Sequence, residues 1–515
     1  MSRINTNVSS LIGQRVLGAN NKLLNTTLER LSTGFKINRG KDDPSGLIAS
    51  QNLRAERSAL GAAISNAERA DQVVNIAEGG LDEVSGLLTE LQGLVTQTAS
   101  TSGLSREEKE ANQLQIDSII QTIDRVSAAT SFQGTKLLNG NFDYATDTVH
   151  ANVKSFKVNG AKLQFGGTQN VDVVVTASAQ VGGYVLSFGA GNLNLGGSGA
   201  SDGADKQFVI EIAGSKGARE LSFASGTTLT SVINAINSFT DVTGVTATAS
   251  GSGGVRLESS DFGSDEFVSV RVVNDGGSQG NGVYALQAGN TSLADTSAAT
   301  AWTAAGNKLT DYGKNVSATI NGIVATTKGT KARINTDFLD VEVDLQSTGS
   351  GANAKTLGAL QAFTITGGGA DFQLAGHVDI AGKVSLGISN VAARTLGRTS
   401  DASSTYFLSD LGSGRTLNVV DGDVTNAQKV IETAIKETSS LRGRLGAFQK
   451  NTIGATVRSL NVASENTAAA ESIIRDTDFA TETAQLTRAQ ILSASAQQVL
   501  GLANSQPQAA LQLLG

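Results

Sequence analysis

The 515-residue chain is first defined by what it lacks. It has no cysteine, which excludes disulfides, thiolate metal sites and lipid-bearing cysteines. It has two prolines, Pro44 and Pro507, and its two histidines, His150 and His377, lie far apart, so no HExxH zinc motif exists. Aromatic residues make up 4% of the chain, and no run approaches the roughly 20 apolar residues of a membrane span. We therefore expect no metal and no membrane insertion.

Charge and glycine content narrow the possible functions further. The formal net charge of −7 is modest and argues against nucleic acid as a partner. The N-terminal MSRINTN lacks the apolar core of a secretory signal, so we expect a chain that is cytosolic or exported without a cleaved signal. The glycine-rich stretches GSGG and GGSGAS lack the Lys-Ser/Thr of a phosphate-binding loop. We expect no enzyme and no cofactor, and both histidines on the surface or at a β edge.

The first quarter of the chain has helical periodicity. Apolar residues recur in steps of three and four over 81–95, over 116–126, and at Leu24, Leu28, Leu31 and Phe35. The run from 44 to 99 would span roughly 80 Å as one helix, although Gly79-Gly80 can interrupt it. Such heptad-like seams predict rods that need partner helices.

Three signals mark where these helices begin and end. Gly34 can end the first helix, and Ser105 with Glu108 has the spacing of a capping box. Asp43 can cap a helix that has Pro44 at its first position. The short charged connector, which we expect to form local or inter-subunit ion pairs, contains Arg39, Lys41, Asp42, Asp43 and Pro44.

From about 140 to 420 the pattern changes to strands. Short β-branched runs (VDVVV at 171–175, FVIEI at 208–212, FVSVRVV at 267–273, VEVDL at 341–345) are separated by Gly, Asn and Asp. Asn321-Gly322 is a candidate hairpin turn, and TTLTSVINAINSF predicts one helix. The middle of the chain is thus expected to form small β-rich domains with thin cores.

From about 423 the helical step returns and continues to the end of the chain. One seam passes through Leu441, Leu445, Phe448 and Thr452. The last segment has an apolar stripe to which we assign Ile491, Leu492, Val499, Leu500, Leu511 and Leu514, together with Ala496 and Ala503. The simplest fold is α+β: a long antiparallel coiled coil or bundle of the N- and C-terminal segments, with the β-rich middle inserted.

A terminal helix pair this rich in Ala and Ser would be only marginally stable in a monomer, because small side chains bury little apolar area. We therefore expect other copies of the chain to cover the closing stripe, in a head-to-tail contact whose repetition gives an open helical filament. The first segment is basic, and one hypothesis is that its basic face meets acidic residues of neighbours such as Asp476, Asp478 and Glu482; a solvated face is the alternative. The basic residues are Arg3, Arg15, Lys22, Arg30, Lys36, Arg39 and Lys41.

Both ends of the chain resemble bacterial flagellin. The N-terminal stretch from Ile4 to Ser50 is similar to the family signature, with Arg30-Leu31-Ser32, Asp42-Asp43 and Gly46 at its fixed points. The C-terminal stretch resembles the second signature through Asp476-Thr477-Asp478, Gln490-Ile491-Leu492 and Pro507-Gln508. A weaker resemblance, at about 203–273, is to the small inserted β module of the family, and FQLAGHVDIAGKVSLGISNVAARTLG is similar to the hairpin that packs on the long helices.

The resemblance implies a layout and a set of partners. Residues 1–42 and 477–515 would form the inner coiled coil, 43–150 and 360–476 a helical shell with its hairpin, and 151–359 the outer β-rich part. It implies a structural filament subunit of the bacterial flagellum that serves swimming motility and is exported unfolded by a type III apparatus. The implied partners are further copies, an export chaperone at the C-terminal segment, and the filament cap and hook-junction proteins.

The resemblance also bears on immune detection. Flagellins of the well-studied type are detected by Toll-like receptor five through an Arg, a Leu and a Glu on two shell helices. Alignment places Glu90, Leu94 and Gln115 at these positions. Glu90 is negative where those flagellins have a positive Arg, and Gln115 is neutral where they have a negative Glu. We therefore expect activation of this receptor to be weak or absent.

Two alternatives remain open at this point. A hook–filament junction protein shares the end motifs, and a surface adhesin could bind a ligand through the middle region. The Ser- and Thr-rich strands from 198 to 310 could carry O-linked sugars or be unmodified.

Overall fold

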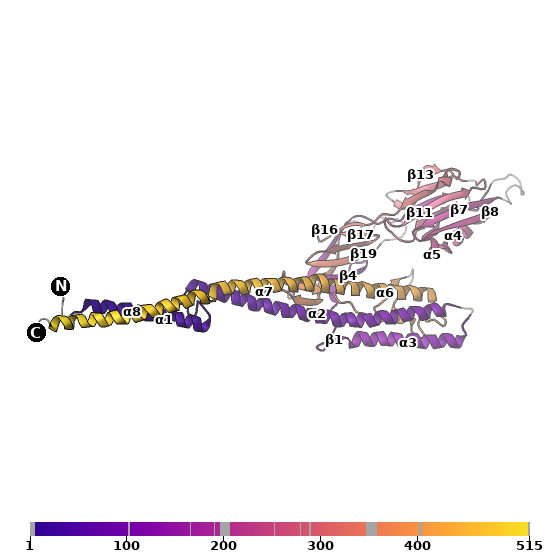
Figure 1. Cartoon of the computed structure of the whole chain (residues 1–515). Helices are drawn as coiled ribbons and strands as arrows, with labels where there is room; N and C mark the ends of the chain where they lie inside the picture. The colour runs from indigo at the N-terminus through magenta and orange to yellow at the C-terminus, as the bar shows by residue number, and fades with distance from the viewer. Residues whose placement is uncertain are drawn as a thin grey trace. The chain divides into compact units, whose positions relative to one another are not determined.

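The computed structural model describes residues 6–100, 103–164, 166–189, 191–195, 206–251, 253–278, 280–287, 290–346, 358–400 and 404–512. The chain forms two compact units: the first comprises 1–78, 372–384 and 442–515, and the second 79–371 and 385–441. Helices occupy both ends of the chain and strands its middle (Figure 1), which confirms the expected α+β class.

The helices begin and end largely where the sequence signals predict. The long helices are α1 (Val8–Thr33), α2 (Pro44–Thr98), α3 (Arg106–Ala129), α6 (Val424–Ala447), α7 (Gly454–Arg475) and α8 (Phe479–Gln512). Gly34 ends α1 in the left-handed conformation at φ 76°, and the Asp43 carboxylate accepts the Gly46 N–H at 2.9 Å. Ser105 and Glu108 form both bonds of the capping box at the start of α3.

Gly79-Gly80 does not interrupt α2, so of the two possibilities that the sequence left open the unbroken helix is the one observed. The helix runs unbroken over 55 residues. A Cβ at Gly80 would lie 2.7 Å from Thr130 Oγ1 and 2.8 Å from Leu138 Cδ1. The glycine is therefore explained by the close packing of the 130–138 segment on the helix, and α2 stays helical there although glycine has a lower helix propensity than alanine.

A π-helical segment, η3 (Phe448–Ile453), joins α6 to α7. The sequence predicted that the seam would pass from Phe448 to Thr452, whereas the structure buries Phe448 and Ile453 and leaves Thr452 partly exposed. The wider turn inserts one residue between successive buried positions, which a 3.6-residue period cannot reproduce.

The middle of the chain forms two β-sandwiches. The first packs a five-stranded sheet (order β13-β12-β6-β10-β9) and a four-stranded sheet (β14-β11-β7-β8) around one core that also takes in α4. Its elements are β6 (Gly183–Ser187), β7 (Gln207–Gly214), β8 (Ala218–Ala224), α4 (Leu229–Asn237), α5 (Thr240–Thr243), β9 (Val245–Ser250), β10 (Gly254–Ser259), β11 (Phe267–Asn274), β12 (Gly282–Gln287), β13 (Asn290–Thr300), η1 (Ala304–Asn307) and β14 (Leu309–Tyr312).

The second sandwich pairs the sheets β16-β15-β5-β20-β3 and β17-β18-β19-β4. Its strands are β3 (Tyr144–Asp147), β4 (Val153–Ala161), β5 (Gln169–Ala177), β15 (Ser317–Ile320), β16 (Ile323–Val324), β17 (Thr326–Lys328), β18 (Lys331–Asn335), β19 (Leu339–Leu345) and β20 (Gly358–Gly368). Asn321 and Gly322, at φ 50° and 79°, turn the β15–β16 hairpin as predicted. All four β-branched runs lie in strands, and TTLTSVINAINSF contains α4.

Three two-stranded sheets complete the described elements: β1 (Ser131–Phe132) with β2 (Thr135–Lys136), β21 (Ala370–Gln373) with β22 (Lys383–Leu386), and β23 (Thr399–Ser400) with β24 (Thr405–Tyr406), the last followed by η2 (Leu408–Leu411). In the first unit the hairpin between β21 and β22 packs against helices: Asn66 of α2 donates to Gln373 O at 3.4 Å, and Phe372 lies 6.2 Å from the Phe448 ring. His150 and His377 are both exposed, as expected.

Candidate assembly interface

Helices α1 and α8 form an antiparallel pair (Figure 1). Polar side chains fix the register along its length. Asn7 donates to Ala503 O at 2.7 Å, and Asn20 donates to Leu492 O at 3.1 Å. Ser493 Oγ, which is itself buried, donates to Asn21 Oδ1 at 2.8 Å.

Small side chains form the seam between the two helices. Besides Glu482, the buried residues of α8 are Ala489, Ser493, Ala496 and Ala503, and those of α1 are Ser10, Gly13 and Thr27. A Cβ at Gly13 would lie 3.2 Å from Leu500 Cδ1, so the backbones approach closely there. The pair therefore fits well, but it buries little apolar area and gains correspondingly little free energy.

Large apolar side chains face away from this seam. They are between 38% and 66% exposed and comprise Val8, Leu11, Ile12, Val16, Leu23 and Leu28 on α1 and Phe479, Ile491, Leu492, Val499 and Leu502 on α8. At about 100° per residue, the four from Ile491 to Leu502 fall within one stripe beside the seam. An exposed apolar stripe of this length is typical of a protein–protein contact surface.

The structure divides the stripe that the sequence predicted. Leu24, Leu31 and Leu500 are half-buried near the seam, whereas Leu28, Ile491, Leu492 and Val499 are exposed. Phe35 lies beyond the end of α1. The side chain of Leu511, at the end of α8, and the whole of Leu514 lie outside the described residues.

The connectors that follow α1 and α7 pair with each other. Lys36 N donates to Arg475 O at 2.7 Å, and Thr477 N donates to Gly34 O at 2.9 Å. In the charged connector, Arg39 binds Glu29 at 2.9 Å, and the Asp42 carboxylate accepts the backbone N–H groups of Asn38 and Arg39. The bond from Arg39 is the main cause of a lowered pKa of Asp42, to which the charge of exposed Lys41 adds.

Arg30 has a partner within its own chain. Its Nη1 lies 3.7 Å from Oε1 of Glu482, whose side chain is 8% exposed. For this arginine, the hypothesis of a carboxylate from a neighbour is therefore replaced by an intramolecular pair that links α1 to α8.

Glu90 and Leu94, two of the three positions that the sequence alignment placed at the receptor contacts, lie on α2, and the third, Gln115, lies on α3. Glu90 and Gln115 are exposed and Leu94 is half-buried. Glu90 and Leu94 are one turn apart on the same face of α2. The antiparallel α3 is joined to α2 by a bond from Asn112 to Thr98 at 3.5 Å, which brings Gln115 roughly level with Leu94 along the helices.

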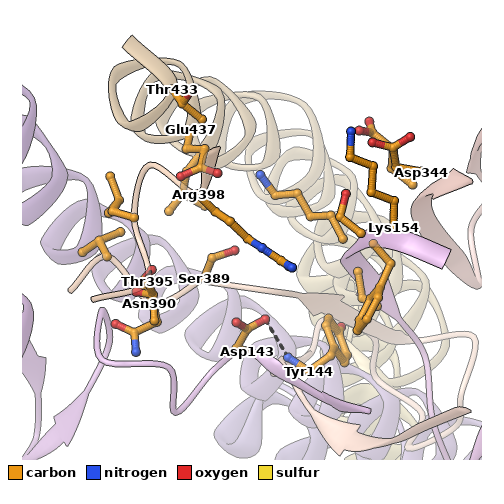
Figure 2. Close-up of a pocket in the computed structure, with 18 of the residues that line it drawn as sticks. Asp143, Tyr144, Lys154, Asp344, Ser389, Asn390, Thr395, Arg398, Thr433 and Glu437 are labelled. Atoms are coloured by element: carbon orange, nitrogen blue, oxygen red, sulfur yellow. Dashed lines mark hydrogen bonds between the residues drawn. The ribbon is translucent and has the colours of Figure 1, made fainter. Parts of the chain in front are cut away.

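A polar cavity of about 780 Å³ lies in the second unit, between β4, α6 and the loop from 389 to 400. Figure 2 shows Arg398 extending toward its middle, with Asp143 and Lys154 on other walls. Glu437 accepts the Gly397 N–H at 2.9 Å, and burial raises the pKa of its carboxyl. Four acidic and four basic residues line the cavity, so its charge favours no ligand of one sign.

The comparisons with known proteins agree with the terminal helices. The family model for the bacterial flagellin N-terminal helical region matches residues 4–143, and that for the C-terminal helical region matches 428–514. The flagellin hook IN motif matches 207–261. Among the helices of the described residues, none combines the length and apolarity needed to cross a membrane.

Relatives match over the whole chain. Flagellin D and flagellin C of Vibrio cholerae are 27% and 28% identical, each over 99% of both chains, and the flagellin of Salmonella choleraesuis is 27% identical over 99% of both chains. The structure of FliC from Burkholderia pseudomallei is 14% identical and covers 74% of this chain and 99% of that one, but its TM-score of 0.22 is too low to bear on the fold.

The matches of both helical ends to these family models define a structural protein of the kind that assembles into polymers. The chain belongs to the bacterial flagellin family, whose members are components of the flagellar filament.

Proposed function

We propose that the chain polymerises head-to-tail into the flagellar filament for swimming motility, with α1 and α8 making the innermost contacts between copies. The supporting observation is the apolar stripe on this pair. A seam of mostly small side chains leaves eleven large apolar side chains of the two helices in water, and a neighbouring copy is the partner that a homopolymer supplies. In this proposal 1–42 with 477–515 form the inner layer, 43–150 with 360–476 the shell, and 151–359 the outer part.

Electron microscopy of purified protein tests the proposal. The full-length chain should form helical tubes, whereas a chain that lacks 477–515 should form none, because it has lost α8. Tubes from the truncated chain, or none from the full-length chain under any salt condition, would contradict polymerisation through the terminal pair.

We also propose that the chain is exported unfolded through the flagellar type III system and that an export chaperone covers α8 beforehand. Support comes from the side chains that would otherwise be in water, Val499 and Leu502, at 59% and 66% exposure. Calorimetric titration of a flagellin-type chaperone should show binding to the full chain and no heat with the chain that lacks 477–515. Equal binding to the full and the truncated chain would show that the chaperone binds outside 477–515.

The filament cap and hook-junction proteins are the remaining proposed partners. A head-to-tail polymer leaves one unmatched patch at each end, so its first and last copies must meet other proteins or stay open. Filament growth from isolated hook-junction ends, but not from ends that lack the junction protein, would support this assignment.

Weak or absent activation of Toll-like receptor five is the last part of the proposal. Glu90 and Gln115 are exposed on α2 and α3, where the well-studied flagellins have an Arg and a Glu. A reporter-cell assay should show a poor response to the purified monomer and a strong response to Glu90→Arg combined with Gln115→Glu. Glu83→Arg, on the exposed side of the same helix, is the matched control and should change nothing.

A further inference from the structure

Three arginines of the first unit, two on α2 and one on α7, converge on one buried carboxylate. Glu471 of α7 has a side chain that is only 11% exposed. Its Oε1 lies 3.6 Å from Arg54 Nε and 3.9 Å from Arg475 Nη1, and its Oε2 lies 3.1 Å from Arg57 Nη1. The Arg475 guanidinium also stacks over the Phe35 ring at 4.3 Å.

The cluster has more positive than negative charge. Three arginines face two carboxylates, Glu471 and Asp476, and the latter is also bound by Ser472 Oγ at 2.6 Å. Arg54 and Arg57 keep 47% and 48% of their side chains exposed. Guanidinium groups carry five donors in a planar fork, and one shared carboxylate cannot satisfy three of them.

Unpartnered buried polar atoms gather in the same region. Arg475 Nε and Glu471 Oε2, both in the pocket, have no hydrogen-bond partner among the described residues, and the same holds for Thr477 Oγ1 in the adjacent connector. Buried groups of this kind are normally paired, so the cluster is incomplete in a single copy of the chain.

These residues enclose a pocket of about 240 Å³ that also includes Ala468. Pockets for small molecules are typically 300–1,000 Å³, so this one has room for a side chain rather than a ligand. We propose that the pocket receives a carboxylate side chain from a second copy of the chain, an inference that rests on the proposed polymerisation. The acidic excess of the chain, 47 Asp and Glu against 40 Lys and Arg, provides the complementary charge.

A photo-crosslinking experiment tests the proposal directly. Because the chain has no cysteine, Ala468→Cys creates a unique attachment point for a thiol-directed photo-crosslinker inside the pocket. Irradiated filaments of the full-length chain should give a covalent dimer, and mass spectrometry should place the link on a peptide with an Asp or Glu next to it. The labelled monomer should give no dimer. Links only within one copy, or only to peptides without an acid, would overturn the proposal.

Charge variants provide the second readout. Arg54→Gln with Arg57→Gln should raise the concentration needed for assembly at least about tenfold and reduce its dependence on salt, whereas Arg69→Gln, exposed further along α2, should do neither. Equal assembly of both variants would contradict the proposal. If labelled Ala468→Cys chains form filaments without an inter-copy link, only the pocket assignment fails; if wild-type chains form no filaments, the proposed polymerisation fails.

Discussion

At the residue scale, the clearest determinants are helix caps. Asp43 accepts the Gly46 N–H, and a Cβ at Gly46 would lie only 2.5 Å from Asp43 Oδ2, so the pair fixes the start of α2. We expect Asp43→Ala to lower the free energy of unfolding by about 1 kcal/mol, and Asp43→Asn, also a good cap, to lower it far less. Urea unfolding followed by circular dichroism measures both, and equal losses would argue against a capping role.

Burial of Glu437 gives a dependence on pH. Burial raises the pKa of this carboxyl above its ordinary 4.5 in the folded state, so the folded chain binds the proton more tightly than the unfolded chain. The penalty for its charge is therefore present at neutral pH and disappears as the pH falls toward 4.5. Glu437→Gln, which keeps an acceptor for Gly397, should raise the Tm at pH 7 and leave it unchanged at pH 4; a lower Tm at pH 7 would contradict this.

Single residues also show the limits of sequence reasoning. Gly34, Asp43 and Ser105 were predictable because each starts or ends a helix within a few residues of itself. Gly34 can adopt the left-handed conformation, and the other two have side chains that accept backbone N–H groups. Gly80 was not, because the reason for it is Thr130 and Leu138, fifty or more residues away. Likewise, the pairing of Arg30 with Glu482 depends on how two remote helices meet.

At the element scale, α8 was correctly predicted as an apolar helix, but the prediction did not separate its buried face from its exposed apolar face. Hydrophobic periodicity counts Ala496 and Val499 alike, yet one is 7% exposed and the other 59%. Which of them faces α1 depends on how closely the backbones approach, and that follows from Gly13 and the small residues of the seam. The sequence could therefore predict the helix and its apolar content, but not the division between internal seam and outward stripe.

The outward stripe leads to a test on this helix. Val499→Asp should leave the α1–α8 seam unchanged but raise the concentration needed for assembly at least about tenfold, because a neighbouring copy would bury an unpaired charge. Gln497→Asp introduces the same charge on the opposite flank of the seam and should assemble nearly as the wild type does. Sedimentation of filaments separates the two outcomes, and equal behaviour would count against the stripe as a contact.

At the scale of the whole molecule, stability should be unevenly distributed. The sandwiches have cores of buried Phe, Ile, Leu and Val, whereas the α1–α8 seam buries mostly Ala, Ser, Thr and Gly. Amide hydrogens of 8–33 and 479–512 should exchange rapidly in the monomer and slowly in the filament, while the strands stay protected in both. Hydrogen exchange with mass spectrometry measures this, and a monomer with fully protected ends would contradict it.

The π-helical turn at Phe448–Ile453 has a consequence for how this protein tolerates change. It takes up one residue more than regular α-helical winding requires, so deletion of one residue within it should give an ordinary helix and leave α7, with Glu471, at its present angle. Deletion of one residue between Gly454 and Glu471, where the winding is regular, should instead rotate the residues that follow by about 100° and turn Glu471 away from Arg54 and Arg57. The wide turn is therefore the place in this stretch of helix where the loss of one residue should be tolerated best.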